Sequence, residues 1–104
     1  MTDNVIIGNR DICAREAPLI VAEMSGNHNQ SLDQAIRIVE AAADSGAHAL
    51  KLQTYTADTM TINVNAGGFS VTDSDSPWHG RSLYDLYEEA HTPWEWHEAI
   101  FNRC

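Results

Sequence analysis

The chain has 104 residues, which is enough for one small domain, and its composition is ordinary for a globular protein. Its formal net charge of −9 repels a phosphate backbone and argues against a nucleic-acid partner. No apolar run approaches the ~20 residues of a membrane span, and the first residues lack the pattern of a secretory signal, so we expect no membrane partner and a cytoplasmic location. Cys13 and Cys104 are too far apart for a zinc motif or disulfide framework and are expected to be unpaired thiols.

The first part of the chain predicts a hairpin and then a buried strand. Residues 5–9 are β-prone and precede Arg10 and Asp11, which suggests a small hairpin before Pro18. Residues 19–23 predict a strand. Its four apolar residues do not alternate with polar ones, which is typical of a strand buried on both faces of a parallel sheet.

A helix and a second strand follow the polar loop of residues 24–30. Ser31 is a helix N-cap residue with Gln34 at the capping-box spacing, and Gly46 is suited to end the helix. Residues 47–52 form the next strand, so the short turn predicts a right-handed β–α–β crossover and a parallel strand pair. The apolar helix face comprises Leu32, Ala35, Ile36, Val39, Ala42 and Ala43.

Residues 54–81 form a long polar segment on the presumed active face. Loops of this length are usually functional or disordered, so both a lid and a surface insertion stay open. Residues 82–90 predict a short helix. Residues 92–95 form a second capping box with Pro93 at the first helical position, so a last helix should run from Pro93 to near Cys104. One face of that helix is expected to pack against a sheet and carries Trp94, His97, Ile100 and Phe101.

The predicted fold class is α/β. Two strands with two or three helices cannot close a sheet or cover these apolar faces, and a (β/α)8 barrel needs about 250 residues. We therefore expect residues 1–104 to form the opening portion of a larger domain.

Polar side chains stand at the exits of both predicted strands, where parallel α/β proteins carry their catalytic groups. Glu23 ends the first strand. Burial there would raise its pKa and suit it to proton transfer, whereas the alternative is a carboxylate satisfied by loop amides or an arginine. Lys51 interrupts the second strand and could bind an anion as a point charge, pair with Glu23, or do both, because the two residues come from neighbouring strands. Gln53 has an amide that suits a sugar hydroxyl or acetamido group.

The loop Gly26-Asn27-His28-Asn29 offers a histidine at a strand exit. His28 is a candidate metal ligand or general acid/base, but it has no partner at ligand spacing, so a hydrogen-bonded loop histidine is favoured. A metal-binding module that uses Glu23 and His28 is the weaker alternative. The other histidines show no constellation either: His48, His79, His91 and His97.

The stretch from Ala22 to Asn29, followed by Ala49 to Thr54, resembles the N-terminal part of the sialic acid synthase family. These enzymes condense phosphoenolpyruvate with an N-acetylated aminosugar to make a nine-carbon sugar acid. The stretches EMSGNHNQSL, HALKLQTYTADTMT and SLYDLYEEAHTPWEWH are most similar to the branch that makes pseudaminic acid. The general family pattern has Ile-Gly after the glutamate and Gly after Asn-His-x, and Met24, Ser25 and Gln30 depart from it.

The resemblance implies a (β/α)8 TIM barrel of which residues 1–104 would be about two βα units. A small antifreeze-like C-terminal domain, absent here, would reach the partner's site in a homodimer. By the same resemblance, Glu23 would contact the open-chain sugar near its aldehyde, Lys51 would hold an anionic group of phosphoenolpyruvate, and Gln53 would bind the sugar. Asn27 and His28 would shape the floor of the site.

The reaction implied is condensation of phosphoenolpyruvate with a 2,4-diacetamido-2,4,6-trideoxy hexose to give pseudaminic acid and phosphate, for surface glycans. The family's divalent metal, Mn²⁺ or Mg²⁺, is held by histidines on later strands, so the resemblance makes none of the histidines here a ligand. The alternatives are an N-acetylneuraminate or legionaminic acid synthase and a catalytically inert fragment that acts by association alone.

Overall fold

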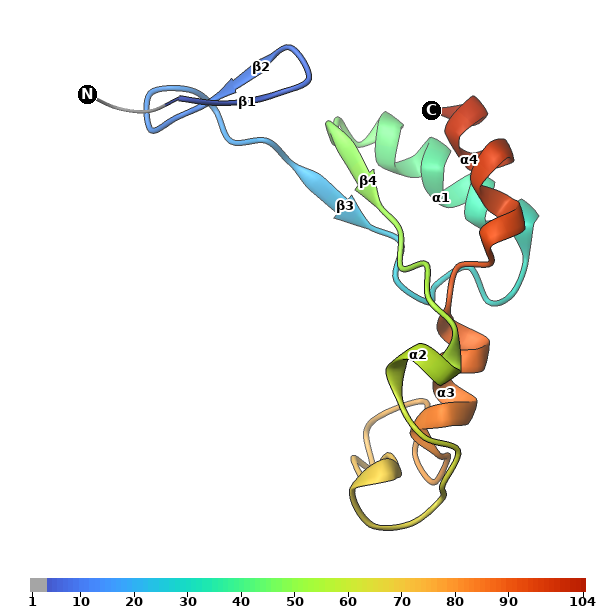
Figure 1. The fold of residues 1–104 in the computed structure, drawn as a ribbon. Coiled ribbons are helices and arrows are strands. Elements are labelled where there is room, and N and C mark those ends of the chain that lie inside the picture. The colour runs from blue at the N-terminus through green and yellow to red at the C-terminus, as the bar shows by residue number, and fades with distance from the viewer. Residues whose placement is uncertain (1–3) are drawn as a thin grey trace.

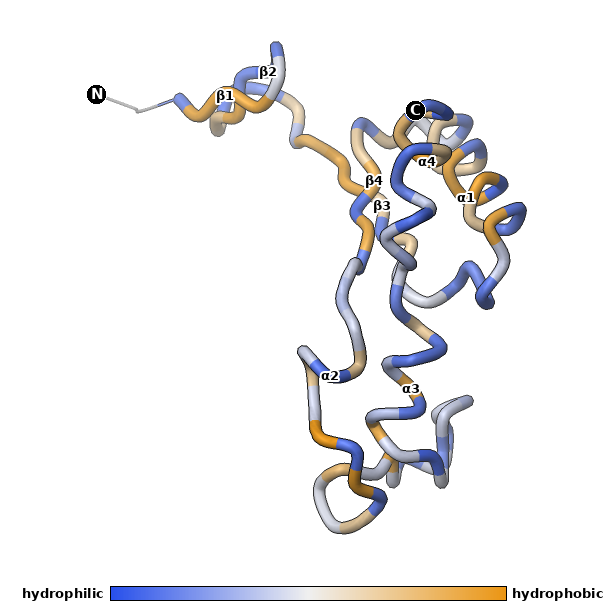
Figure 2. The backbone as a smooth tube through the Cα atoms, turned by 45° about the vertical axis from the view of Figure 1, so that its right-hand side comes forward, coloured by the Kyte–Doolittle hydropathy of each residue, from blue (hydrophilic) through white to orange (hydrophobic). Residues whose placement is uncertain are grey.

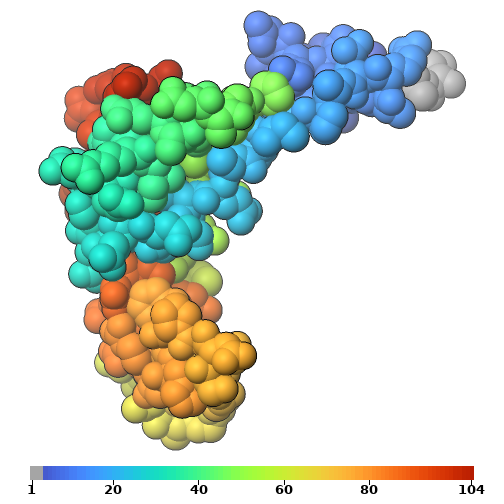
Figure 3. Space-filling view, turned by 180° about the vertical axis from the view of Figure 1, so that it is seen from behind, coloured from blue at the N-terminus to red at the C-terminus, as the bar shows by residue number. Residues whose placement is uncertain are grey.

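The computed structural model describes residues 4–104, and these residues form an elongated body (Figure 1). The radius of gyration is 17.2 Å and the principal extents are 50 × 35 × 25 Å, whereas a compact domain of this size has a radius of gyration of about 13 Å. The space-filling view shows the N-terminal hairpin projecting from one end and a helical arm from the other (Figure 3). The strand pair that carries the candidate residues lies between them.

The predicted hairpin is confirmed. Strands β1 (Val5–Ile7) and β2 (Arg10–Ile12) pair in antiparallel register, with Gly8 in the left-handed region at φ +63° in the turn. Apolar residues run along β1 and again through β3 and β4 (Figure 2). The β1 side chains are more than half exposed, so the described residues do not cover this apolar strand.

The predicted parallel β–α–β unit is also confirmed. Strand β3 (Val21–Glu23) leads through α1 (Leu32–Asp44) to β4 (Ala49–Lys51), and the two strands pair in parallel. The burial predicted for the first strand is wrong for this chain, because Val21 is 46% exposed. The reason is that β3 pairs with β4 alone among residues 4–104, which leaves its other edge and part of its faces open.

The ends of α1 follow the sequence signals. Ser31 Oγ accepts a hydrogen bond from the Gln34 backbone N–H at 3.2 Å, which satisfies one of the free donors of the first turn. Gly46 adopts φ +87° directly after the C-cap residue Ser45. This left-handed conformation is unfavourable for other residues and turns the chain into β4 within a few residues.

A small hydrophobic core joins α1 to the last helix. Met24, Ala35, Val39 and Ile100 are its buried members. Helix α4 (His97–Arg103) packs along α1, as Figure 1 also shows. Partly buried side chains complete the cluster: Leu32, Ile36, Ile38, Leu50, Leu52 and Trp96. The connection from β3 to α1, which begins at Met24, is therefore anchored in this core. In the described part of the chain no helix is both long and apolar enough to cross a membrane.

The long segment after β4 contains more structure than the sequence predicted. It forms α2 (Ala57–Met60) and a 3₁₀ turn, η1 (Gly67–Phe69), before α3 (Leu83–Ala90), which is the predicted short helix. Helix α2 packs against α3, and Tyr84 Oη donates to Asp58 Oδ1 at 3.0 Å. These elements form the arm seen at the lower end of Figure 1.

The prediction of a second capping box at residues 92–95 is wrong. Pro93 has ψ 139°, which is not helical, and the chain passes through a 3₁₀ turn, η2 (Trp94–Trp96), before α4. Thr92 is fully buried, and among the described residues its hydroxyl has no hydrogen-bond partner. The backbone N–H of Thr92, which the Glu95 side chain would bond in a capping box, is instead bonded to Gln53 O at the exit of β4, as described below.

The shared face predicted for the last helix is only partly right. Ile100 is 2% exposed, but Trp94 is 73% and Phe101 67% exposed. Trp94 stacks on His97 with ring centroids 4.8 Å apart instead of packing against the sheet. The side chain that enters the core from this region is Trp96, because the 3₁₀ turn changes the helical phase.

Candidate functional site

Glu23 and Lys51 lie side by side at the exits of the parallel strands. They are partners in the register of β3 and β4, so their side chains leave the same face of the sheet. Lys51 Nζ is 3.0 Å from Glu23 Oε1, which is an ion pair with hydrogen-bond geometry. The pairing that the sequence left as one alternative for Lys51 is therefore present.

The pair is open to solvent. The side chains of Lys51 and Glu23 are 54% and 59% exposed, so the burial expected for Glu23 is not found among residues 4–104. An exposed ion pair stabilises a fold by only about 0–1 kcal/mol. Such a pair is weak enough for an anionic ligand to separate, because the ligand replaces one carboxylate partner of Lys51 with another anion.

The loop of residues 24–30 continues from Glu23 and is tied to both strands. The Met24 N–H donates to Lys51 O at 3.1 Å, which extends the strand pairing by one residue. The Met24 carbonyl accepts from both the backbone N–H and the side-chain Nδ2 of Asn27, the latter at 2.9 Å. Asn27 itself is exposed.

Three residues of this loop are in the left-handed region without being glycine. Ser25, Asn29 and Gln30 have φ values of 52°, 53° and 59°. This conformation costs roughly 1–2 kcal/mol for a residue with a Cβ atom. Ser25 and Gln30 stand at the two positions where the general pattern of the resembled family has glycine, so the backbone shape explains that pattern. Strain of this kind collects at functional sites.

His28 is the hydrogen-bonded loop histidine that the sequence favoured. It is fully buried, its Nε2 lies 3.1 Å from Ala90 O, and its Nδ1 accepts from the Gln30 N–H at 3.0 Å. These partners require a neutral ring with the proton on Nε2. Burial lowers the pKa of His28, against the opposing effect of its backbone hydrogen bonds. Since both nitrogens are occupied and the ring is inaccessible, His28 supports the loop and does not touch a ligand or metal in this arrangement.

Gln53 lies just beyond β4 and is half-buried. Its carbonyl accepts from the Thr92 N–H at 2.8 Å, which ties the exit of β4 to the chain after α3. Gln53 thus lies two residues beyond Lys51 at the exit of β4, and the side to which its amide points stays a prediction.

Tyr55 lies further along the chain that leaves β4. Its ring packs edge-on against Tyr87 with centroids 5.5 Å apart, and it also lies near His91. Burial raises the pKa of Tyr55, with a smaller contribution from Tyr87, so the phenol stays protonated and is a hydrogen-bond donor at neutral pH. The residue follows Gln53 by two positions.

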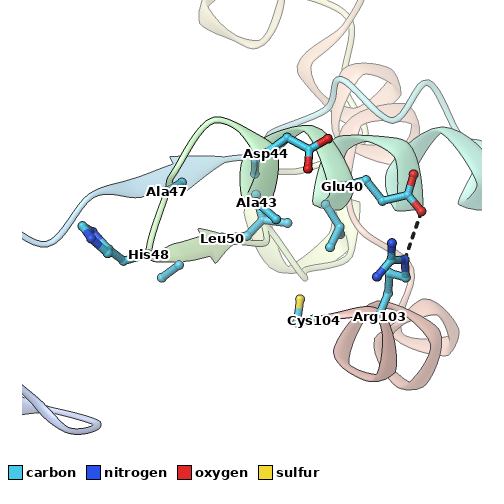
Figure 4. Close-up of a pocket in the computed structure, with 11 residues that line it drawn as sticks. Glu40, Ala43, Asp44, Ala47, His48, Leu50, Arg103 and Cys104 are labelled. Atoms are coloured by element: carbon cyan, nitrogen blue, oxygen red, sulfur yellow. Dashed lines mark hydrogen bonds and ion pairs between the residues drawn. The ribbon is translucent and has the colours of Figure 1, made fainter.

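A separate hollow of about 550 Å³ lies between α1, the start of β4 and the end of α4 (Figure 4). It is at the entry of β4, opposite the strand exits. Its lining mixes small apolar residues with charged ones and includes an ion pair of 3.0 Å between Arg103 Nε and Glu40 Oε1. The candidate residues are therefore absent from this hollow.

No group of three or more potential His, Cys, Asp or Glu ligands gathers anywhere in residues 4–104. The polar groups at the strand exits are a paired carboxylate, amides and an ammonium group, which has no lone pair for a metal. The nearby imidazole is already bonded at both nitrogens. These residues do not form a metal site by themselves.

The strained exit loop and the paired charges at neighbouring strand ends define an α/β protein with its polar site at the carboxyl ends of parallel strands. The sequence profile of the NeuB family matches residues 38–104, which is more than half of the chain. The chain belongs to the NeuB family. The recognition made from the motifs is thereby confirmed.

Three relatives show where in this family the chain falls. It is 46% identical over 82 residues to a pseudaminic acid synthase of Campylobacter jejuni, a match that covers 79% of this chain and 23% of that protein. It is 44% identical over 86 residues to a pseudaminic acid synthase of Helicobacter pylori, covering 83% and 25%. A Bacillus subtilis spore coat polysaccharide biosynthesis protein, SpsE, is 31% identical over 99 residues, covering 94% and 25%. The chain spans about a quarter of the length of these relatives.

Proposed function

We propose that the protein carrying this chain is a nonulosonic acid synthase that condenses phosphoenolpyruvate with a 2,4-diacetamido-2,4,6-trideoxy hexose to give pseudaminic acid and phosphate. The observation that carries the proposal is the Glu23–Lys51 pair at two adjacent strand exits, in a chain that shares 44–46% identity with pseudaminic acid synthases. A carboxylate can act at the sugar aldehyde and a cation can bind anionic phosphoenolpyruvate. Because both side chains leave the same face of the sheet, the two substrates would be brought together there.

The reaction forms one carbon–carbon bond and breaks the C–O bond to phosphate. Carbon 3 of phosphoenolpyruvate attacks the aldehyde carbon of the open-chain sugar, and a carbon–carbon bond forms while the aldehyde oxygen gains a proton. Water adds to the cationic carbon 2, losing a proton, and the tetrahedral intermediate breaks its C–O bond to release phosphate and leave a 2-oxo acid.

The residues of this chain have separate parts in this scheme. Lys51 holds an anionic group of phosphoenolpyruvate, and Glu23 lies near the aldehyde and assists proton transfer. Gln53 and Asn27 offer amides to the sugar and its acetamido groups. His28 keeps the loop in shape from below.

A divalent metal, Mn²⁺ or Mg²⁺, remains an expectation from the family resemblance. Residues 4–104 supply no cluster that fits it, so its ligands would come from elsewhere in the protein and we assign no step to it. The (β/α)8 barrel, the antifreeze-like domain and the homodimer are proposals of the same origin. The exposed apolar faces of β1 and β3 and the elongated shape support a chain that packs within a larger body.

Two rival functions deserve a test. The first rival is a legionaminic acid synthase, because a Legionella pneumophila N,N′-diacetyllegionaminic acid synthase is 51% identical over 41 residues, which is 39% of this chain. The second rival is an inert chain that acts by association alone, which its small core and open strand edges favour.

The test is an assay of the natural protein at its full length with phosphoenolpyruvate and three sugars: the pseudaminic acid precursor, the legionaminic acid precursor and N-acetylmannosamine. Phosphate release and sugar-acid formation should be equal and fastest with the pseudaminic acid precursor. Phosphoenolpyruvate labelled with ¹⁸O at the bridging oxygen should deliver the label to phosphate, because the C–O bond breaks. Preference for another sugar would transfer the proposal to that synthase, and no turnover with any of them would favour the inert chain.

A further inference from the structure

The three residues Ala90–Thr92 connect the exits of both strands. The Ala90 carbonyl is bonded to His28, in the loop that follows β3, at 3.1 Å. Two residues later, the Thr92 N–H donates to the Gln53 carbonyl, beyond β4, at 2.8 Å. One short segment is therefore hydrogen-bonded to both segments of the chain that leave the sheet.

This connection is tightly packed. A Cβ atom at Gly26 would lie 2.9 Å from Ala90 Cβ, so the loop backbone and the end of α3 are already in close contact. Trp96 packs edge-on against the His28 ring at 4.9 Å between centroids and an interplanar angle of 85°. His28 and Thr92 are 0% exposed. Hydrogen bonds in such surroundings do not exchange readily with water and hold their geometry.

The loop held in this way begins directly after Glu23. It contains the left-handed residues Ser25 and Gln30, and strained conformations persist only where their surroundings impose them. His28 Nδ1 accepts from the Gln30 N–H while Nε2 is bonded to Ala90, so a single ring joins the strained loop to α3. The Met24 N–H also donates to Lys51 O, and this bond connects the loop to β4.

We propose that Ala90–Thr92 is a clamp on the two strand exits, and that His28 is the positioning residue through which this clamp sets Glu23 relative to Lys51. This inference rests on the proposed function, in which those two side chains serve the two substrates. It assigns His28 a role in turnover without contact with either substrate.

The kinetic test separates the two hydrogen bonds of the ring. H28Q keeps an amide N–H that reaches Ala90 O, whereas H28N keeps only the short-range acceptor for Gln30 and loses the clamp. In the full-length natural protein, H28N should lower kcat about 10- to 100-fold with KM for both substrates within about threefold, because displaced catalytic groups are felt in the transition state. H28Q should recover most of this loss.

The matched control is H48N. His48 also makes a bond between segments distant in the sequence, its Nδ1 accepting from the N–H of Ile20, 28 residues earlier, at 2.9 Å, but this bond lies at the entry of the strands. It should leave kcat within about twofold of wild type. Equal kcat losses in H28N and H28Q that follow the folded fraction, or a kcat for H28N within about threefold of wild type, would overturn the positioning role.

Amide hydrogen exchange tests whether the clamp exists, independently of enzymatic activity. In wild-type protein, hydrogen exchange at the Met24 and Thr92 amides should be slowed to a similar degree, because both report opening of the same clamp. In H28N both should exchange faster while the Ser45 amide, bonded to Ala41 O in α1, stays unchanged. Fast exchange at Thr92 beside a protected Met24 in wild type would exclude the clamp. An inactive wild type with the expected exchange pattern would reject the proposed function alone.

Discussion

Lys51 Nζ lies 3.0 Å from Glu23 Oε1 because the parallel register sets these two residues directly opposite each other at the last pair of β3 and β4. Both side chains are more than half exposed, so the pair adds little to stability. Its geometry instead brings a carboxylate and a cation to one point at the strand exits. Substitutions there should change activity far more than they change folding.

Glu23→Gln should lower kcat by at least about 100-fold, because the amide cannot transfer the proton that the carboxyl group does. The melting temperature should change by no more than a few degrees. Steady-state kinetics with both substrates measure the first effect, and thermal unfolding measures the second. The matched control is Glu40→Gln, which breaks the ion pair with Arg103 at the other end of β4 and should leave kcat unaltered. Activity of Glu23→Gln within about threefold of wild type would remove its assigned role.

Lys51→Met should raise KM for phosphoenolpyruvate about 10- to 100-fold, with a smaller effect on KM for the sugar. The reason is that the ammonium group is the cation nearest to Glu23 on this face, and a hydrogen bond to a charged group contributes about 1.5–3 kcal/mol. Initial rates at varied phosphoenolpyruvate concentration measure this effect. Arg103→Met provides the comparison, and an equal rise in KM in both variants would mean that the charge acts at long range.

Ser25→Gly and Gln30→Gly should each raise the free energy of unfolding by about 0.5–1 kcal/mol. Glycine relieves the left-handed strain at these φ values, partly offset by the greater entropy of the unfolded chain. Urea unfolding of the purified protein measures the change. Gln34→Gly is the control inside α1, where glycine should lower stability by about 1 kcal/mol. Destabilisation by Ser25→Gly would show that the serine side chain is needed in this loop.

Gly26→Ala should destabilise the protein by about 1–3 kcal/mol, because the new Cβ would lie 2.9 Å from Ala90 Cβ. Ala90→Gly removes that atom and should restore part of the loss in the double variant, although the Ala90 Cα would still be 3.2 Å away. A double-mutant cycle of unfolding free energies measures the coupling. Additive losses would mean that the two residues do not pack as described.

The stability of the protein should fall as the pH drops below about 6.5 through the titration of His28. Its pKa is lowered in the folded state, chiefly by burial, so the unfolded chain binds the proton more tightly and gains population as the pH falls. This loss should begin near the unfolded pKa of about 6.5 and be complete below the lowered folded pKa. The charge of His91 also opposes protonation of His28.

The measurement is unfolding free energy from pH 8 to pH 4.5 in wild type and H28Q, whose amide does not titrate. The difference between the two proteins should shrink on the acid side of this window. A constant difference would show that His28 is not protonated on unfolding, and an NMR titration of its ring would then show where its pKa lies.

Local signals in the sequence predicted the elements that local physics controls. The apolar run before Glu23, the Ser31 cap and the glycine after α1 specify the β–α–β unit without reference to distant residues, and all three have the predicted structure. The parallel pairing followed from the short turn after α1. Glu23 and Lys51 could be placed at one edge on that basis.

The second half of the chain depended on contacts that no local pattern contains. Thr92-Pro93-Trp94-Glu95 has the capping-box spacing, yet the Thr92 N–H is bonded to Gln53, 39 residues earlier, and this contact overrides the cap. Helix α2, within the long polar segment, was not predicted, because a single turn of helix has too few residues for a periodic signal. The 3₁₀ turn then shifted the phase of α4 and moved Trp96, instead of Trp94, into the core.

The sequence by itself determined the family, the parallel strand pair and the identity of the charged residues at its exits, because each depends on residue type and short-range spacing. Only the tertiary structure decided that Glu23 is exposed, that His28 is buried with both nitrogens bonded, and that Ala90–Thr92 joins the two exits. Burial and the bond from His28 to Ala90, 62 residues away, depend on how the arm folds back onto the strands, and no local signal records the free energy of that long-range packing.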